Sequence, residues 1–427
     1  MTSVSISTVM KKAISTSLLT KGVGAVYQVV SLPLIIGLLT EEEFGYFSVL
    51  TALIGWVTIL QGGIGPSITR LYARNSRVSI KSRIEAVTLG IVFLYGAILL
   101  VALMVLSYTE IIIPKYRFEA FLLSILVFLT LVFSLADSVR LGLHQQHILN
   151  IYMAVSNILV VASLYLVSKQ LFLDKYDFLL IIMAIYLPPV IVKIINSIEV
   201  YGGLSNLPKV ISYSRNKRLY KIVGLLITSV IFVQISGMLI KSISAMYWGV
   251  YDIKEAGRLE VIFRTLTILG TFYPMIQIPL WPLLIRARRE GERVILRNIS
   301  MYLVLGFFSF SILILFVLGF GGESLFSIWL GKMNYFSVAE IYAVGFYFIA
   351  ISISQALIVI YMGYEKFSVL SKVLFSEALL YALVIAAAHY MSYSIDLSDM
   401  LYVLCFLRVL VGIYLAARFY RYELCQN

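Results

Sequence analysis

The sequence predicts an all-α polytopic membrane protein with about twelve transmembrane helices in two six-helix lobes. The chain of 427 residues is 61% hydrophobic and only 13% charged, whereas a soluble globular chain is about 45–50% apolar and about 25% charged. Its apolar runs are about 20 residues long and do not alternate, which indicates membrane-crossing helices rather than barrel strands. These runs recur along the whole chain with short connections between them.

The opening stretch, residues 11–83, shows the pattern that the rest of the chain repeats. Two lysines precede an apolar segment, an acidic turn follows at residues 41–43, and a second apolar segment leads into a basic stretch. We interpret the first segment as a retained helix, because its apolar run is longer than that of a signal peptide. The predicted spans are approximately 13–39, 44–64, 84–107, 118–139, 148–167, 177–197, 222–246, 258–284, 299–319, 339–361, 369–390 and 398–417.

Lysine and arginine are distributed unevenly between alternate loops. The loops on the N-terminal side carry about three times as many of them as the loops on the other side. Because positively charged loops stay in the cytoplasm, we expect both termini to be cytoplasmic. The same bias explains the net charge of +12, so we expect no nucleic-acid partner.

A connection halfway along the chain divides the predicted spans into two sets of six. An internal repeat supports this division: a shift of 212 residues places Glu43-Phe44-Gly45 over Glu255-Ala256-Gly257. Repeated halves of a transporter place the substrate path at their interface. The predicted domains are an N-terminal lobe at 1–200, a cytoplasmic linker at 201–221 and a C-terminal lobe at 222–427.

Nine charged residues fall within predicted spans, where each costs on the order of 2.5–3.5 kcal/mol at the bilayer centre. Glu260 and Arg264 are four residues apart on one helix face, which predicts an ion pair. Glu377 and Arg408 lie at similar depth on consecutive spans, so they either neutralise each other or serve a substrate. The nine are Lys21, Asp137, Lys193, Lys241, Glu260, Arg264, Lys372, Glu377 and Arg408.

The balance of these charges is positive, with six bases and three acids. Lys21 has no acid within a turn on its own helix, which suggests that it faces a water-filled cavity. Lys241 lies near the outer end of its span and either reaches the headgroups or contacts a substrate. A surplus of positive charge favours an anionic solute such as a diphosphate, whose oxygens pair with cationic side chains.

Motifs for catalysis are not found in the sequence. There is no phosphate-binding glycine loop with lysine and no G-x-S-x-G elbow. His144 and His147 are three apart but have no third ligand nearby, which argues against a metal site. We expect a protein that is not an enzyme and holds no cofactor, apart from a coupling proton or sodium ion.

The N-terminal motifs resemble a known family. Lys21-Gly22, Pro33, Phe44-Gly45-Tyr46 and the stretch from Gly62 to Arg70 are similar to the start of bacterial polysaccharide transporters. The resemblance is to the O-antigen flippases (Wzx type) of the multidrug/oligosaccharidyl-lipid/polysaccharide (MOP) superfamily. It implies a MATE-like, V-shaped pair of lobes in the bacterial inner membrane.

The resemblance also implies a task and its partners. An undecaprenyl-diphosphate-linked oligosaccharide, the repeat unit of O-antigen or capsule, would cross from the cytoplasmic to the periplasmic leaflet by alternating access through a cationic central cavity. Besides this substrate and the membrane lipids, an O-antigen polymerase and a chain-length regulator are the implied partners. Such a role belongs to lipopolysaccharide and polysaccharide biosynthesis.

The same likeness assigns roles to the charged residues. Lys21 and Arg264 are expected to contact the diphosphate or sugar, with Lys241 and Arg408 as further substrate-binding candidates. Arg70 would lie at the cytoplasmic mouth, although the positive-inside bias explains Arg70 equally well. The candidates for a coupling proton or sodium ion are Asp137, Glu377 and Glu260.

Three alternatives remain open at this point. One is another MOP-superfamily transporter, either a peptidoglycan-precursor flippase or a multidrug antiporter, although an antiporter is expected to have an acidic cavity. The second is an integral-membrane O-antigen polymerase, which usually has a large outer loop, whereas the longest outer loop expected here, Phe320–Ser337, is short. The third is a structural or assembly protein, which would not need charges deep in the membrane.

Overall fold

The computed structural model describes most of the chain, and within the described residues no strand is found. Eight helical stretches among them are long and apolar enough to cross a membrane. The predicted all-α polytopic fold class is therefore confirmed, and the chain is a multi-pass membrane protein. The described residues are 6–52, parts of 89–101, 116–143, 145–169, 177–203, 237–273, 284, 292–332, 335–364, 366–391 and 395–421.

The chain folds into two compact units. The first comprises Met1–Gln234 and Trp248–Gly257, and the second comprises Ile235–Tyr247 and Arg258–Asn427. The division runs through helix α10 (Ile253–Gly270), whose first turn belongs to the first unit. Most of the predicted linker, 201–221, lies outside the described residues, so the predicted domain boundaries stay a prediction.

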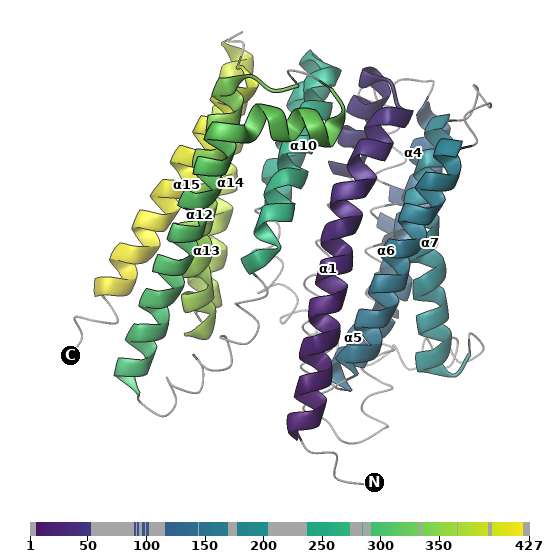
Figure 1. Ribbon diagram of the computed structural model, residues 1–427, viewed down its shortest axis with the longest axis horizontal. Coiled ribbons are helices and arrows are strands. Elements are labelled where there is room, and N and C mark those ends of the chain that lie inside the picture. Colours follow the sequence, from purple (N-terminus) through teal and green to yellow (C-terminus); the bar gives the residue numbers. More distant parts are fainter. Residues whose placement is uncertain are drawn as a thin grey trace. The chain divides into compact units, whose positions relative to one another are not determined.

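In the first unit, long helices pack along one another (Figure 1). Helix α1 lies against α6, which lies against α7, and α7 also packs on α4. The Thr20 hydroxyl of α1 donates a 2.9 Å hydrogen bond to the carbonyl oxygen of Asn150 on α6. The helices are α1 (Ile6–Leu38), α4 (Arg117–Phe133), α5 (Leu135–Gly142), α6 (Gln146–Lys169) and α7 (Asp177–Tyr201).

The helical segment 41–52 packs closely against residues 253–257 within the first unit. The Ser48 hydroxyl donates a 2.7 Å hydrogen bond to the carbonyl oxygen of Ala256. A Cβ added at Gly257 would lie 2.8 Å from the Phe44 ring. These are the two stretches that the internal repeat superposes, so the glycines of the repeat mark a close contact between repeated segments.

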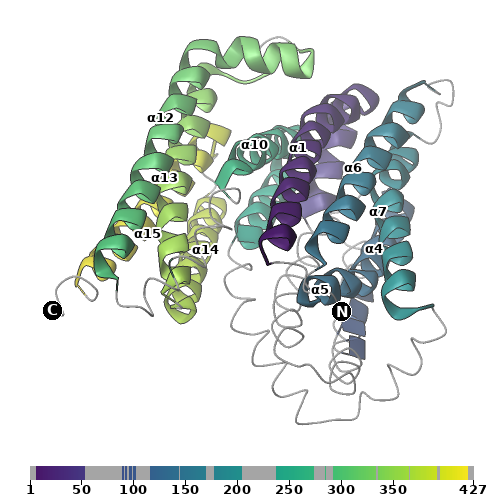
Figure 2. The ribbon, with the colours of Figure 1, turned by 60° about the horizontal axis from the view of Figure 1, so that its bottom comes forward.

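In the second unit, helix α13 is the central element. It packs against α12 on one side and α15 on another, and α14 packs on α15 (Figure 2). Phe348 and Tyr381, on α13 and α14, are fully buried among their neighbours. The helices of this unit are α12 (Arg293–Leu330), α13 (Val338–Gly363), α14 (Phe367–Tyr390) and α15 (Leu397–Phe419).

Helix α12 extends beyond its predicted bounds at both ends. The sequence predicts a span at 299–319 followed by a loop at Phe320–Ser337, but the helix runs from Arg293 to Leu330. The predicted loop is therefore wrong as far as Leu330. Phe326 and Leu330 are buried at helical spacing, and this burial favours helix over loop.

Candidate functional site

Three charged side chains in the second unit form one cluster, which we call the cation triad: Lys241, Glu260 and Arg264. The Lys241 ammonium lies 2.7 Å from Glu260 Oε2, and Arg264 Nε lies 3.0 Å from Glu260 Oε1. The predicted pair of Glu260 and Arg264 is confirmed. The Lys241 ammonium, for which contact with the headgroups or with a substrate was expected, pairs with Glu260.

The local fold explains how the triad assembles. Lys241 belongs to the helical segment 237–251, and α10 follows directly after Asp252. The Asp252 carboxylate accepts a 3.0 Å hydrogen bond from the backbone N–H of Lys254, which caps the start of α10. The two consecutive helices thus bring Lys241 against the Glu260 face of α10. At about 1.5 Å per residue, the triad lies about 12–18 Å along them from this turn.

The triad carries one net positive charge, and its positive side is the accessible one. The side chains of Lys241 and Arg264 are 26% and 17% exposed, whereas that of Glu260 is 3% exposed. A carboxylate buried this deeply is stable only when paired, and here two cations share it. The arrangement offers cationic groups to a solute and withholds the acid.

A second pair of opposite charges lies between α14 and α15. Arg408 Nε is 2.9 Å from Glu377 Oε1, and the Glu377 side chain is fully buried. Of the two roles expected for this pair, the structure shows mutual pairing. The buried Tyr347 of α13 lies close to this pair. Because the pair is balanced, Arg408 adds no surplus charge for an anionic substrate.

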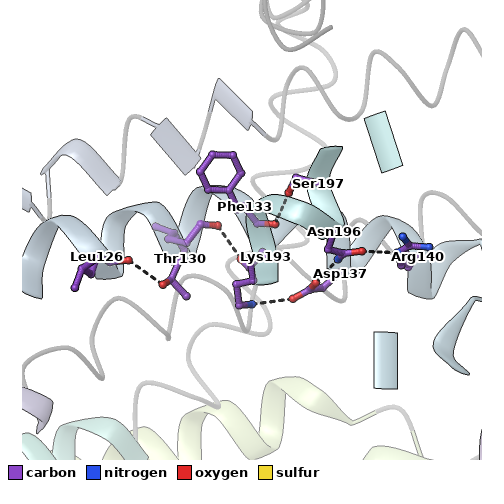
Figure 3. A network of polar contacts seen from close by, with 10 residues as sticks. Leu126, Thr130, Phe133, Asp137, Arg140, Lys193, Asn196 and Ser197 are labelled. Carbon is purple, nitrogen blue, oxygen red and sulfur yellow. Dashed lines mark hydrogen bonds and ion pairs between the residues drawn. The ribbon is translucent and has the colours of Figure 1, made fainter. Parts of the chain in front are cut away.

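The first unit contains a polar network between α5 and α7, centred on Asp137 and Asn196 (Figure 3). Asp137 Oδ2 lies 2.8 Å from the Lys193 ammonium, and Asp137 Oδ1 accepts a 2.7 Å hydrogen bond from the Asn196 amide. The side-chain oxygen Oδ1 of Asn196 accepts a hydrogen bond from Arg140 Nε. One buried amide thus joins an acid–base pair on one side to a guanidinium on the other.

The network continues from Arg140 to the end of α7. Arg140 Nη2 lies 2.6 Å from Glu199 Oε2, and Arg140 Nη1 donates to Gln145 Oε1 at 3.1 Å. The side chain of Arg140 is almost fully buried, and that of Glu199 is largely exposed. The network contains two acids and two bases, so it is electrically balanced. Its groups satisfy one another, which is the pattern of a structural network.

Lys21 differs from the other predicted site residues. It is half-buried on α1, and no acidic partner is found for it among the residues that the structure describes. Lys372, also predicted to lie within a span, is exposed on α14. Arg70 lies outside the described residues, and so does His144. Within the described part of the chain, no group of three His, Cys, Asp or Glu side chains could hold a metal ion.

The sequence analysis placed Glu260 near Arg264 and Glu377 near Arg408. It did not predict two other ion pairs among its candidate residues. Lys241 with Glu260 could have been found, because both lie at similar distances from the turn at Asp252. Lys193 with Asp137 joins α5 to α7, which are not consecutive, so no local spacing indicates it. Asn196, Arg140 and Glu199 were not candidates.

Comparison with known proteins shows which solved structures share this fold. No protein-family profile and no curated protein sequence matches the chain. Among solved structures, an inward-facing MATE-family multidrug resistance transporter of the MOP superfamily superposes with a TM-score of 0.75 at 9% identity, over 94% of this chain and 96% of that one.

Two further structures agree. The MATE multidrug transporter DinF-BH matches with a TM-score of 0.62 at 16% identity, covering 98% of this chain and 96% of that one. A MOP-superfamily transporter from Pyrococcus furiosus matches with a TM-score of 0.60 at 10% identity, covering 96% and 94%. The chain therefore has the fold of MATE transporters of the MOP superfamily.

Proposed function

We propose that this protein is a membrane transporter that flips an anionic lipid-linked oligosaccharide, of the undecaprenyl-diphosphate class, from the cytoplasmic to the periplasmic leaflet. The solute's sugars and diphosphate are too polar to cross the hydrocarbon layer unaided. The protein would provide a polar, cationic path for them while the polyprenyl chain stays in lipid. The O-antigen or capsule repeat unit is the substrate that the N-terminal sequence motifs suggest.

The observation that carries this proposal is the cation triad. Two bases surround one buried carboxylate, and the bases are its accessible part. An arriving diphosphate oxygen can pair with Lys241 or Arg264 and share the cation with Glu260. Arginine is suited to this contact, because its planar guanidinium matches phosphate oxygens in a two-point geometry. Lys21 supplies a further cation in the first unit.

The comparisons support a transporter, and one of them bears on the substrate. Two of the similar solved structures are described as multidrug transporters. The description of the Pyrococcus furiosus protein states that reverse polarity of its binding pocket suggests a different function. For the present chain we likewise propose that the charge of the site reflects its own function, the binding of an anionic substrate.

A multidrug antiporter is the second candidate, since the fold is shared with DinF-BH, a MATE multidrug transporter. A cationic drug needs an accessible acid to pair with. The two acids at depth in the second unit, Glu260 and Glu377, are buried and already paired with bases. This arrangement favours the anionic substrate over the cationic one.

The three candidate acids indicate which energy source could drive transport. Asp137, Glu260 and Glu377 each hold an internal cation at 2.7–2.9 Å. A sodium ion at any of them would have to displace a lysine or arginine side chain. We therefore favour protonation of one of these carboxylates, or the membrane potential acting on the surplus positive charge, over sodium binding.

Reconstitution tests the proposal directly. The purified protein in liposomes, loaded with a fluorescent undecaprenyl-diphosphate oligosaccharide in one leaflet, should expose the sugar to a reagent on the other side. Because a hydrogen bond to a charged group contributes about 1.5–3 kcal/mol, Lys241→Gln and Arg264→Gln should slow this step by roughly tenfold or more. Lys254→Gln is the matched control, since Lys254 is exposed.

The outcome also separates the two candidates. Uptake of a cationic dye driven by a proton gradient, with no movement of the lipid-linked sugar, would assign the protein to multidrug transport. In cells, deleting the gene should remove surface polysaccharide and leave lipid-linked single repeat units inside. Unchanged surface polysaccharide in the deletion strain would reject the flippase assignment.

A further inference from the structure

Helix α12 is too long for a simple membrane span. Its 38 residues would extend about 57 Å at 1.5 Å per residue, whereas the hydrocarbon core is ~30 Å thick and the whole bilayer ~40–45 Å. Figures 1 and 2 both show that the C-terminal part of α12 turns and runs across the direction of the preceding part. We call residues 320–330 the transverse segment.

Glycines allow the bent part of α12 to pack closely against α13. A Cβ added at Gly322 would lie 2.7 Å from Ile341 Cγ2, and one added at Gly319 would lie 3.2 Å from the Tyr342 ring. Three glycines within four residues, 319–322, are also a common cause of a helix bend. The bend is thus fixed by close contact with the first turns of α13.

The transverse segment has two different faces. Gly322, Phe326 and Leu330 recur every four residues and are buried. The Phe326 ring packs edge-on against Phe336, with 4.9 Å between the ring centroids. The opposite face carries Phe320 and Ile328, which are 89% and 83% exposed.

We propose that the transverse segment lies within the headgroup–acyl boundary of the bilayer, with Phe320 and Ile328 in contact with lipid. The exposed apolar face continues that of the membrane-spanning part of α12, where Leu313 and Phe316 are also exposed. A helical segment that turns across the direction of its span stays close to the membrane surface, so lipid is the medium that contacts this face.

The composition of the segment also defines the kind of lipid contact. Glu323 is its single charged residue, and Lys332 follows just beyond its end. With no basic cluster, the segment has no electrostatic reason to select anionic lipids. The contact rests on the apolar side chains and is independent of the substrate that the protein carries.

Depth-dependent quenching in nanodiscs tests this placement. The full chain with Cys405→Ala and Cys425→Ser receives one new cysteine, Ile328→Cys or, separately, Phe320→Cys, labelled with the fluorophore NBD. We expect the strongest quenching from a nitroxide at a shallow acyl position, with weaker quenching from a deep acyl nitroxide and from aqueous iodide. The pattern should be the same in neutral and anionic nanodiscs.

Two labels on other sites serve as controls. Leu313→Cys, on the membrane-spanning part of α12, should be quenched best by the deep nitroxide, and Glu323→Cys best by a headgroup nitroxide or iodide. If iodide quenches the labels at 320 and 328 more strongly than any lipid nitroxide, the face is in water and the proposal fails. If no quencher reaches them, protein covers the face, a second copy for example, and the proposal fails as well.

Discussion

Gly45 lies so close to Ile253 that a Cβ added to Gly45 would be 1.9 Å from the Ile253 carbonyl oxygen. The two backbones therefore touch where the helical segment 41–52 meets the first turn of α10. No side chain fits between them, and the contact involves backbone on one side, which cannot rotate away. The hydrogen bond from Ser48 to Ala256 closes the same contact one turn further on.

We predict that Gly45→Ala destabilises the protein by about 1–3 kcal/mol, the usual cost of overpacking a tight contact. Thermal unfolding in detergent, followed by size-exclusion chromatography with fluorescence detection, measures the effect. Gly37→Ala is the matched control, because nothing lies within 4 Å of a Cβ at this helical glycine. Alanine is favoured over glycine within a helix by roughly 0.5–1 kcal/mol, so the control should be neutral or stabilising.

A second prediction concerns the acid of the cation triad. Glu260→Gln leaves Lys241 and Arg264 without their shared counter-charge, and breaking a buried ion pair costs about 3–5 kcal/mol. We expect a large fall in the unfolding temperature and in the yield of folded protein. Glu41→Gln, which removes an exposed carboxylate 3.8 Å from Lys254, should change neither.

The double variant makes this prediction sharper. Lys241→Met removes one of the two surplus cations, so Glu260→Gln combined with Lys241→Met should recover part of the lost stability. Residues in contact give non-additive effects of this kind. A double variant whose loss equals the sum of the two single losses would mean that the two side chains do not interact.

The eight apolar helical stretches among the described residues were predictable from the sequence, because length and apolarity alone define a membrane span. The ion pair of Glu260 with Arg264 was predictable for a similar reason, since both residues lie on one helix face four positions apart. The network around Asn196 was not, because it joins residues of α5 and α7 that are far apart in sequence. The sequence also does not indicate that an uncharged amide within a span hydrogen-bonds to two charged groups.

The end of α12 shows a different limit of sequence analysis. The predicted span ended at residue 319, and glycines, which are unfavourable within a helix, stand at 319, 321 and 322. Packing against Ile341 and Tyr342 requires small residues at this bend, and burial of Phe326 and Leu330 holds the helix beyond it. Tertiary contact thus overrides local propensity, and only the three-dimensional arrangement shows the contact.

A third prediction tests the network of the first unit. Asn196→Ala removes the amide that serves both Arg140 and Asp137, and each hydrogen bond to a charged group contributes about 1.5–3 kcal/mol. We expect a clear loss of thermal stability. Ser168→Ala is the control, because its hydroxyl is exposed and donates only to the Tyr165 carbonyl oxygen of its own helix. Equal stability of both variants would contradict the structural role of the network.

A fourth prediction tests whether Lys21 takes part in transport. Lys21→Gln removes a cation for which no acidic partner is found among the described residues, so folding should not suffer. The transport of the lipid-linked sugar should fall by roughly tenfold, if one charge-assisted contact to phosphate of about 1.5 kcal/mol is lost.

Lys372→Gln, at an exposed position on α14, is the matched control and should transport normally. The transport rate per folded protein is the quantity to compare. Normal transport by Lys21→Gln would remove this residue from the substrate path, whereas a fall in protein yield would show that Lys21 supports the fold instead.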